Sequence, residues 1–174
     1  NGVVEVLGLF CASQNLFLAV VYRQPDDSAG GNRSTIGELK PAIDKLQAAI
    51  SDIGEPTPNI LICGDFNLPT HVWNKSDSDK GGSLNSYLDN FVNSNFLTQH
   101  ITNPTHKDGN LLDLVFTNND SILHSYDCIP PSLTSISDHF IIECKTTIGA
   151  KEELTNELPP KVSPLDHLTF LSND

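Results

Sequence analysis

Apolar residues occur along most of the chain in short runs of strand length, separated by polar turns. Two such runs, residues 3–11 and 16–22, flank the polar turn 13–15 and predict an antiparallel hairpin. Four consecutive apolar residues at 60–63 predict a strand that is buried on both faces. Further strands are expected at residues 111–117, 122–129 and 140–148, with a short one within 96–101.

Two stretches follow the spacing of an amphipathic helix instead. The first carries apolar residues at Ile36, Leu39, Ile43, Leu46 and Ile50. Thr35 and Glu38 match a capping box there. Because Pro41 has no backbone donor inside a helix, this helix is expected to begin near Lys40. The second helix follows Ser83, which can cap it, and its apolar face is formed by Leu84, Tyr87, Leu88, Phe91 and Val92.

Length and composition indicate one globular domain. The chain has 174 residues, of which 38% are hydrophobic and 18% charged. No apolar run approaches the roughly 18 residues that a membrane helix needs. We expect residues 1–150 to form the domain, and residues 151–174, with their Glu and Pro, to be a linker or tail. Because the chain contains no Met and starts inside an apolar pattern, it is interpreted as part of a longer protein.

The charge and the cysteines narrow the classes of function. A net charge of −12 argues against a module that binds nucleic acid passively, because the overall field repels phosphates. It argues less against a metal-dependent enzyme, whose site needs carboxylates. The four cysteines form no C-x-x-C pair, which argues against a zinc site. They are interpreted as buried free thiols in a reducing compartment.

The most informative polar residues follow the 60–63 run. Gly64 comes after this run and is followed by Asp65 and Asn67. In an extended segment the last two side chains would point the same way, so that a carboxylate and an amide would meet. The carboxylate could orient a water or bind a metal, and the amide could donate to a phosphate oxygen. A plain Asx turn after the strand explains the same residues with about equal weight.

Two further polar clusters adjoin apolar strands. Asp113 lies within the run 111–116, where a carboxylate is costly unless an ion pair or a neighbouring loop satisfies it. Ser137, Asp138 and His139 come directly before the last strand, and such a group is a solvated turn in most proteins. Because strand-end loops of open α/β sheets gather into one crevice, the three clusters together indicate a site.

These motifs, in this order, resemble the endonuclease/exonuclease/phosphatase superfamily. They are Tyr22-Arg23-Gln24-Pro25, Gly64-Asp65-Phe66-Asn67, Leu112-Asp113-Leu114-Val115-Phe116-Thr117-Asn118 and Ser137-Asp138-His139. The nearest similarity is to the apurinic-type endonuclease domain of non-LTR (LINE-like) retrotransposons. It covers residues 3–148 and implies an α/β (α+β) fold, a DNase I-like sandwich of two β-sheets flanked by helices.

The resemblance also implies roles for the motif residues in phosphodiester hydrolysis. Asp65 would orient or activate the attacking water, and Asn67 would hold the scissile phosphate. Tyr22 would donate to a phosphate oxygen. His139, held in place by Asp113, would stabilise charge in the transition state.

The resemblance further implies a metal and a substrate surface. Asp138 would lie near a divalent metal, Mg²⁺ or Mn²⁺, and Thr105 would begin a hairpin, 105–110, that contacts DNA. Trp73 would line the cleft or simply pack. The family's early Asn and metal-binding Glu have no counterpart, since Glu5 lies inside a strand. The chain is therefore expected to lack the domain's N-terminal strands and to show little Mg²⁺-dependent nuclease activity alone.

Three functions follow from this resemblance. The chain would belong to an endonuclease domain that nicks target DNA beside a reverse transcriptase domain, to a non-catalytic remnant of one, or to a phosphoesterase acting on small phosphoesters. The form of the motif at 112–118 favours the retroelement branch over the last. An intracellular location, nuclear or cytoplasmic, without a membrane partner, is expected.

The motif residues are expected to converge on one cleft. They are Tyr22, Asp65, Asn67, Asp113, Asp138 and His139. The side chains of Asp113 and His139 in particular are expected within hydrogen-bond reach, about 2.6–3.2 Å. If these two side chains pointed to opposite faces of the sheet, the catalytic assignment would be wrong.

Overall fold

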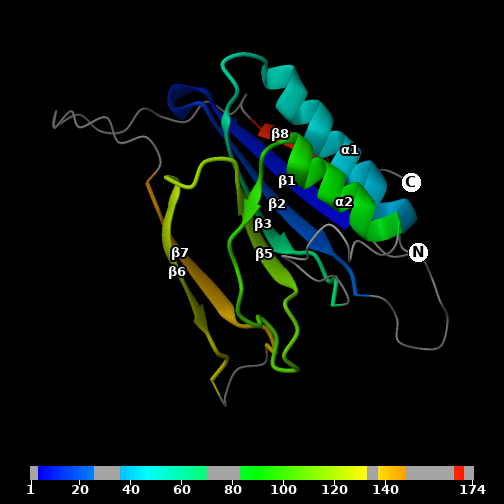
Figure 1. Cartoon of the computed structure of the whole chain (residues 1–174), viewed down its shortest axis with the longest axis vertical. Helices are drawn as coiled ribbons and strands as arrows, with labels where there is room; N and C mark the ends of the chain where they lie inside the picture. The colour runs from blue at the N-terminus through cyan, green and yellow to red at the C-terminus, as the bar shows by residue number, and fades with distance from the viewer. Residues whose placement is uncertain (1–3, 26–35, 70–82, 133–136, 148–166, 171–174) are drawn as a thin grey trace, which may run out of the picture.

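Two β-sheets form the centre of the computed structural model, which describes residues 4–25, 36–69, 83–132, 137–147 and 167–170 (Figure 1). The larger sheet has six strands in the order β4-β5-β3-β2-β1-β8, and the smaller one pairs β6 with β7. The strands of the larger sheet are β1 (Val4–Cys11), β2 (Leu16–Arg23), β3 (Asn59–Asp65), β4 (Thr98–Gln99), β5 (Asp113–Thr117) and β8 (His167–Phe170). Those of the smaller sheet are β6 (Leu123–Ile129) and β7 (Ile141–Thr146).

Two helices, α1 (Ile36–Ile53) and α2 (Ser83–Ser94), lie on one face of the larger sheet (Figure 1). Helix α1 connects β2 to β3, which are parallel neighbours, so the three elements form a β-α-β unit. β1 and β2 form the predicted antiparallel hairpin, closed by the short helix η1 (Ala12–Gln14). Because β5 runs antiparallel along the other edge of β3, β3 is paired on both sides.

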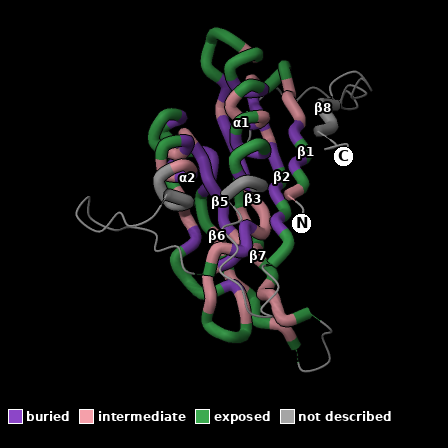
Figure 2. Tube along the Cα trace, turned by 90° about the vertical axis from the view of Figure 1, so that its right-hand side faces the viewer, coloured by how far each residue is buried: buried purple, intermediate pink, exposed green. Residues whose placement is uncertain are grey.

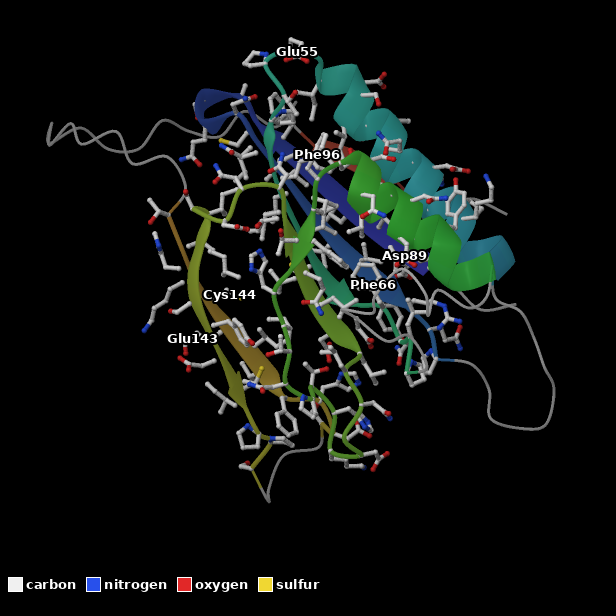
Figure 3. The ribbon with its side chains drawn as sticks, viewed as in Figure 1. Glu55, Phe66, Asp89, Phe96, Glu143 and Cys144 are labelled. Atoms are coloured by element: carbon white, nitrogen blue, oxygen red, sulfur yellow. The ribbon has the colours of Figure 1, made fainter. Side chains whose placement is uncertain are left out.

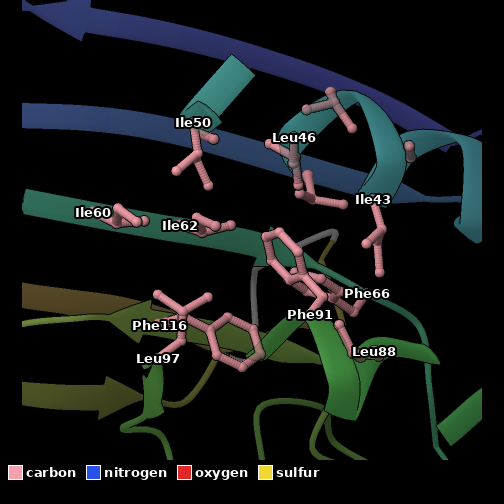
Figure 4. Close-up of a cluster of buried hydrophobic side chains, with 14 of the residues drawn as sticks. Ile43, Leu46, Ile50, Ile60, Ile62, Phe66, Leu88, Phe91, Leu97 and Phe116 are labelled. Carbon is pink, nitrogen blue, oxygen red and sulfur yellow. The ribbon is translucent and has the colours of Figure 1, made fainter. Parts of the chain in front are cut away.

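The main hydrophobic core lies between the helices and the larger sheet. Ile60 and Ile62 of β3 point toward the helices, and each is only 1% exposed (Figure 4). Phe66 directly after β3 packs edge-on against Phe116 of β5, with ring centroids 5.5 Å apart. The buried residues therefore lie along the central strands, while exposed residues lie on the outer side of the helices (Figure 2).

A second hydrophobic cluster lies between the larger sheet and the β6–β7 pair. Its buried members are Leu16, Leu61, Ile101, Val115 and Leu123. All four cysteines pack against it as free, partly buried thiols; Figure 3 shows Cys144 on β7. The cysteines are free, as predicted, but they are partly rather than fully buried. The two-sheet α/β architecture and a central strand buried on both faces are confirmed.

The start of the first helix differs from the expectation. Helix α1 begins at Ile36 rather than near Lys40, and Pro41 lies inside it. A proline at this position removes only the one hydrogen bond that the carbonyl of Gly37 would accept. The burial of neighbouring side chains such as Ile43, 3% exposed, offsets that loss.

Strand β8 lies within the stretch that was expected to be a linker or tail, and it pairs antiparallel with β1. The domain boundary near residue 150 and Trp73 lie outside the described residues. Among the helices that the structure describes, none combines the length and the apolar character needed to span a bilayer.

Gly64 lies where a side chain has no room. Its φ is +141°, and a Cβ built on it would lie 1.9 Å from the carbonyl oxygen of Val21. Because this neighbour is backbone, it cannot swing aside. Gly64→Ala should lower the free energy of unfolding by more than about 4 kcal/mol, measured by urea denaturation. Gly54→Ala is the matched control: its φ is +77° with nothing within 4 Å, so only strain of about 1–2 kcal/mol is expected. Equal losses in the two variants would contradict the prediction.

Candidate active site

Three neighbouring strands place a row of polar residues on the face of the larger sheet that lies opposite the helices. Tyr22 of β2 is opposite Asp65 of β3, and Asp65 is opposite Asp113 of β5. Val21 and Leu114, the chain neighbours in β2 and β5, are buried in the helix-side core. Because side chains alternate along a strand, the three polar residues point the other way. Tyr22 remains 43% exposed.

His139 joins this row from the segment that precedes β7. Its Nδ1 lies 2.9 Å from Oδ2 of Asp113, and its Nε2 lies 3.9 Å from Oδ2 of Asp65. The predicted contact between Asp113 and His139 is confirmed. The imidazole thus lies between two carboxylates from adjacent strands, with the Asp113 carboxylate fixing its orientation.

Asp65 and Asn67 also meet, but not through an extended backbone. Asn67 has a left-handed conformation with φ of 46°, so the expectation of two extended residues is wrong. The backbone N–H of Asn67 donates to Oδ1 of Asp65 at 3.0 Å, and its side-chain Nδ2 donates to Oδ2 at 2.8 Å. This is the Asx turn that the sequence also allowed. It holds both carboxylate oxygens of Asp65 in place.

A reciprocal pair of hydrogen bonds ties the ends of β2 and β3 together. The buried Arg23 donates from Nη1 to the carbonyl oxygen of Asn67 at 2.7 Å, and Asn67 Nδ2 donates to the carbonyl oxygen of Arg23 at 2.6 Å. With its bond to Asp65, both hydrogens of the Asn67 amide are donated within the protein. In this conformation Asn67 positions Asp65, and its role in holding the scissile phosphate stays a prediction.

Thr105 is likewise placed differently from the expectation. It is fully buried, so its side chain does not present itself to a substrate. Its hydroxyl oxygen accepts hydrogen bonds from the backbone N–H groups of Leu112 at 3.0 Å and of Asp113 at 2.9 Å. Its carbonyl oxygen accepts from the N–H of Phe140 at 2.7 Å. Thr105 therefore links Asp113 to the segment that carries His139.

Asp138 lies beside His139 in sequence, but its carboxylate contacts other residues. Oδ2 is 3.2 Å from Nε2 of His106 and 3.3 Å from Nζ of Lys107. The ring of His106 stands edge-on to that of His139, with centroids 5.1 Å apart. His106 is the site residue that sequence reasoning missed, because a single His in a turn carries no signal of its own. Its place is set by the backbone bridge that pairs it with His139.

Burial and the close spacing of these side chains shift several pKa values in the site. Burial, and then the charge of Asp113, raise the pKa of Asp65, against the opposing effects of Asn67 and His139. Burial lowers the pKa of His139, but the hydrogen bond and charge of Asp113, with Asp65 and Asp138, raise it overall above 6.5. The hydrogen bond from its own backbone N–H, then Lys107 and His106, lower the pKa of Asp138. The site thus favours a protonated imidazole between carboxylates.

Two groups of side chains could hold a metal ion among the described residues. One consists of Asp65, Asp113 and His139, and the other of His106, Asp138 and His139; in each, the ligand atoms lie within 4.8 Å of one another. Only the first offers two carboxylates, the oxygen ligands that Mg²⁺ and Mn²⁺ prefer. The mutual repulsion seen in the raised pKa of Asp65 would be relieved by a cation there.

The arrangement can perform acid–base and electrostatic chemistry. Asp65, held at both oxygens, can orient a water or accept its proton. A protonated His139, held by Asp113, can stabilise negative charge on a nearby oxyanion. Such a pair suits the hydrolysis of an anionic ester.

The chain matches one family model and is similar to two solved structures. A family model described as endonuclease-reverse transcriptase matches residues 16–143. A search of curated proteins finds no match. Among solved structures, the chain is similar to the endonuclease domain of TRAS1, a telomere-specific non-LTR retrotransposon, with 11% identity and a TM-score of 0.49 over 83% of this chain and 62% of that one. It is also similar to a beta toxin of Staphylococcus aureus, with 13% identity and a TM-score of 0.47 over 84% of this chain and 58% of the toxin. The chain thus spans less than two thirds of either structure.

The pKa of His139 provides a direct test of the geometry. We expect the imidazole to titrate above 6.5, and Asp113→Asn to lower its pKa because both the hydrogen bond and the charge weaken. The measurement is a histidine NMR titration, with Asp127→Asn, a change at an exposed residue of β6, as the control. Because the folded pKa is raised, the pair stabilises the fold fully below about pH 6.5, and this contribution is lost as pH rises through the folded pKa. An unchanged titration in Asp113→Asn would refute the pairing.

The buried hydroxyl of Thr105 provides a second test. Thr105→Val keeps the shape but leaves the N–H groups of Leu112 and Asp113 without their acceptor. The free energy of unfolding should fall by about 1–3 kcal/mol in chemical denaturation. Thr105→Ser retains the hydroxyl and should lose clearly less. If Ser and Val were equally destabilising, the methyl group rather than the hydroxyl would matter.

Proposed function

Since the chain belongs to the endonuclease-reverse transcriptase family, we propose that it contributes the hydrolytic site of an endonuclease domain that cleaves phosphodiester bonds in DNA. The observation that carries this proposal is the constellation of Asp65, Asp113 and His139, in which one imidazole lies 2.9 Å and 3.9 Å from two carboxylates. A retrotransposon-type domain that nicks its target DNA is the specific form we infer.

Each residue of the constellation has a role that its contacts support. Asp65 orients the attacking water and takes up its proton; its half-buried position and raised pKa make it a better base than an exposed carboxylate. The carboxylates around His139 raise its pKa and so favour the imidazolium, which stabilises the charge that develops on the phosphate. Asp113 is a positioning residue that holds the imidazole. Tyr22, exposed on the same face beside Asp65, donates to a phosphate oxygen.

The same residues fit a divalent cation. Asp65 and Asp113 supply two carboxylates close together, and Mg²⁺ is usually held by one or two carboxylates with the substrate phosphate. When bound, Mg²⁺ or Mn²⁺ would neutralise charge on the phosphate and the leaving oxygen. Asp138, the ligand suggested by resemblance, is engaged by Lys107, so it could serve only after that ion pair opens.

We further propose that the domain works beside a reverse transcriptase inside the cell, where target DNA is present. The family description joins the two activities. The net charge of −12 supports the need for such a partner, because the overall electrostatic field of this chain repels DNA. A neighbouring domain would have to supply a cationic surface that binds it.

The test is nicking of supercoiled plasmid, in Mg²⁺ or Mn²⁺, by a purified protein that contains the whole chain. Asp65→Ala should lower the rate constant for nicking by about 10²–10⁴-fold, because a general base contributes this much. His139→Ala should lower it by about 10²–10³-fold, the usual loss when one electrostatic stabiliser is removed. His124→Ala and Asp127→Ala, both exposed on β6, are the matched controls and should nick normally. Nicking at the normal rate by a folded His139→Ala or Asp65→Ala protein would remove that residue from the mechanism.

A further inference from the structure

We propose that His106, Asp138 and His139 form a binding site for a transition-metal ion such as Zn²⁺. One ligand atom from each residue lies within 4.8 Å of the other two. The site shares His139 with the proposed hydrolytic constellation, but His106 and Asp138 lie outside that constellation. No cysteine takes part, so the missing C-x-x-C pattern, which argued against zinc, does not apply to it.

The ligand types select the metal. Two imidazoles and one carboxylate suit Zn²⁺, Ni²⁺, Cu²⁺ and Co²⁺, and three protein ligands leave an open position for water. Mg²⁺ prefers oxygen ligands, and only Asp138 supplies one here. The cluster would therefore take a transition metal in the presence of Mg²⁺, while the carboxylate pair Asp65 and Asp113 would not compete strongly for it.

His139 has the carboxylate support that metal-binding histidines use, and His106 has a carboxylate nearby that could provide it. Such a histidine binds metal through one ring nitrogen and donates the other N–H to a carboxylate or carbonyl. His139 Nδ1 lies 2.9 Å from Asp113 Oδ2, and His106 Nδ1 lies 3.6 Å from Asp108 Oδ2. At present His106 Nδ1 accepts the N–H of Asp108 at 3.2 Å, so its proton is on Nε2, facing Asp138. Metal binding at Nε2 would move that proton to Nδ1, where the Asp108 carboxylate would accept it.

The backbone holds the ligands close before any metal binds. His106 and His139 form a β-bridge, and the N–H of Lys107 donates to the carbonyl oxygen of Asp138 at 3.0 Å. The N–H of Phe140 donates to Thr105 in the same ladder. The segments 105–107 and 138–140 therefore hold all three ligands close together, so that metal binding would require little further ordering of the backbone.

Lys107 pairs with the carboxylate that the cation would need. Its Nζ lies 3.3 Å from Asp138 Oδ2, and its side chain is 59% exposed, so it can move into solvent when a metal replaces its charge. A bound metal would also withdraw His139 from the phosphate. Inhibition of nicking by Zn²⁺ is the consequence, and this consequence alone rests on the proposed function.

The experiment measures metal binding directly, so it stands whether or not the protein is a nuclease. The full chain, in reducing buffer, is titrated with Co²⁺ and followed by visible absorption, and then competed with Zn²⁺. We expect one equivalent to bind with tetrahedral d–d bands and without the sulfur-to-metal charge-transfer band that cysteine ligation would produce. Saturating Mg²⁺ should leave the spectrum unchanged.

The variants separate ligation from folding. His106→Ala should weaken Co²⁺ binding at least about 10-fold, and Asp108→Asn, which removes only the supporting carboxylate, about 10–100-fold. Lys107→Gln should bind more tightly, since it removes the competing ammonium. His124→Ala, an exposed histidine on β6, is the control and should bind normally. Binding that is absent, that involves sulfur, or that is unaffected in both His106→Ala and Asp108→Asn would overturn the proposal.

Discussion

The pairing of β3 with its two neighbours is the constraint on which the site depends. The parallel register with β2 places Tyr22 beside Asp65, and the antiparallel register with β5 places Asp113 on the other side. A shift of one residue would turn these side chains into the helix-covered core, because side-chain direction alternates along a strand. The close approach of Gly64 to Val21 allows this register, since no other residue has room there.

The position of this row between two cores explains its electrostatics. The helices cover one face of the larger sheet, and β6 and β7 partly cover the other, so the carboxylates lose water without becoming fully buried. Asp65 and Asp113 repel each other at this short range, and His139 is the group that offsets the repulsion. Burial raises the pKa of Asp65 and opposes the rise at His139, whereas the charge of Asp113 raises the pKa of both groups.

The remaining part of the site depends on the turn at 105–110. Thr105 binds the backbone of Asp113 through its hydroxyl and the backbone of Phe140 through its carbonyl. Through these two contacts, the buried Thr105 sets the distance between the Asp113 carboxylate and the His139 imidazole. His106 and Asp138 are brought together by the same ladder, so the hydrolytic constellation and the transition-metal cluster share one support.

The sequence by itself determined the helices, the strands other than β8 and the polar residues at strand ends, because hydrophobic periodicity is a local property that burial enforces. A carboxylate inside an apolar run must be paired, but it was the resemblance to the family that implied His139 as the partner of Asp113. Only the tertiary structure decided that Thr105 is buried and that His106 contacts Asp138. It also decided that both hydrogens of the Asn67 side-chain amide are donated to groups inside the protein. Each of these features depends on a contact between segments distant in sequence or on a left-handed backbone conformation. Features of these two kinds leave no periodic signal in the chain.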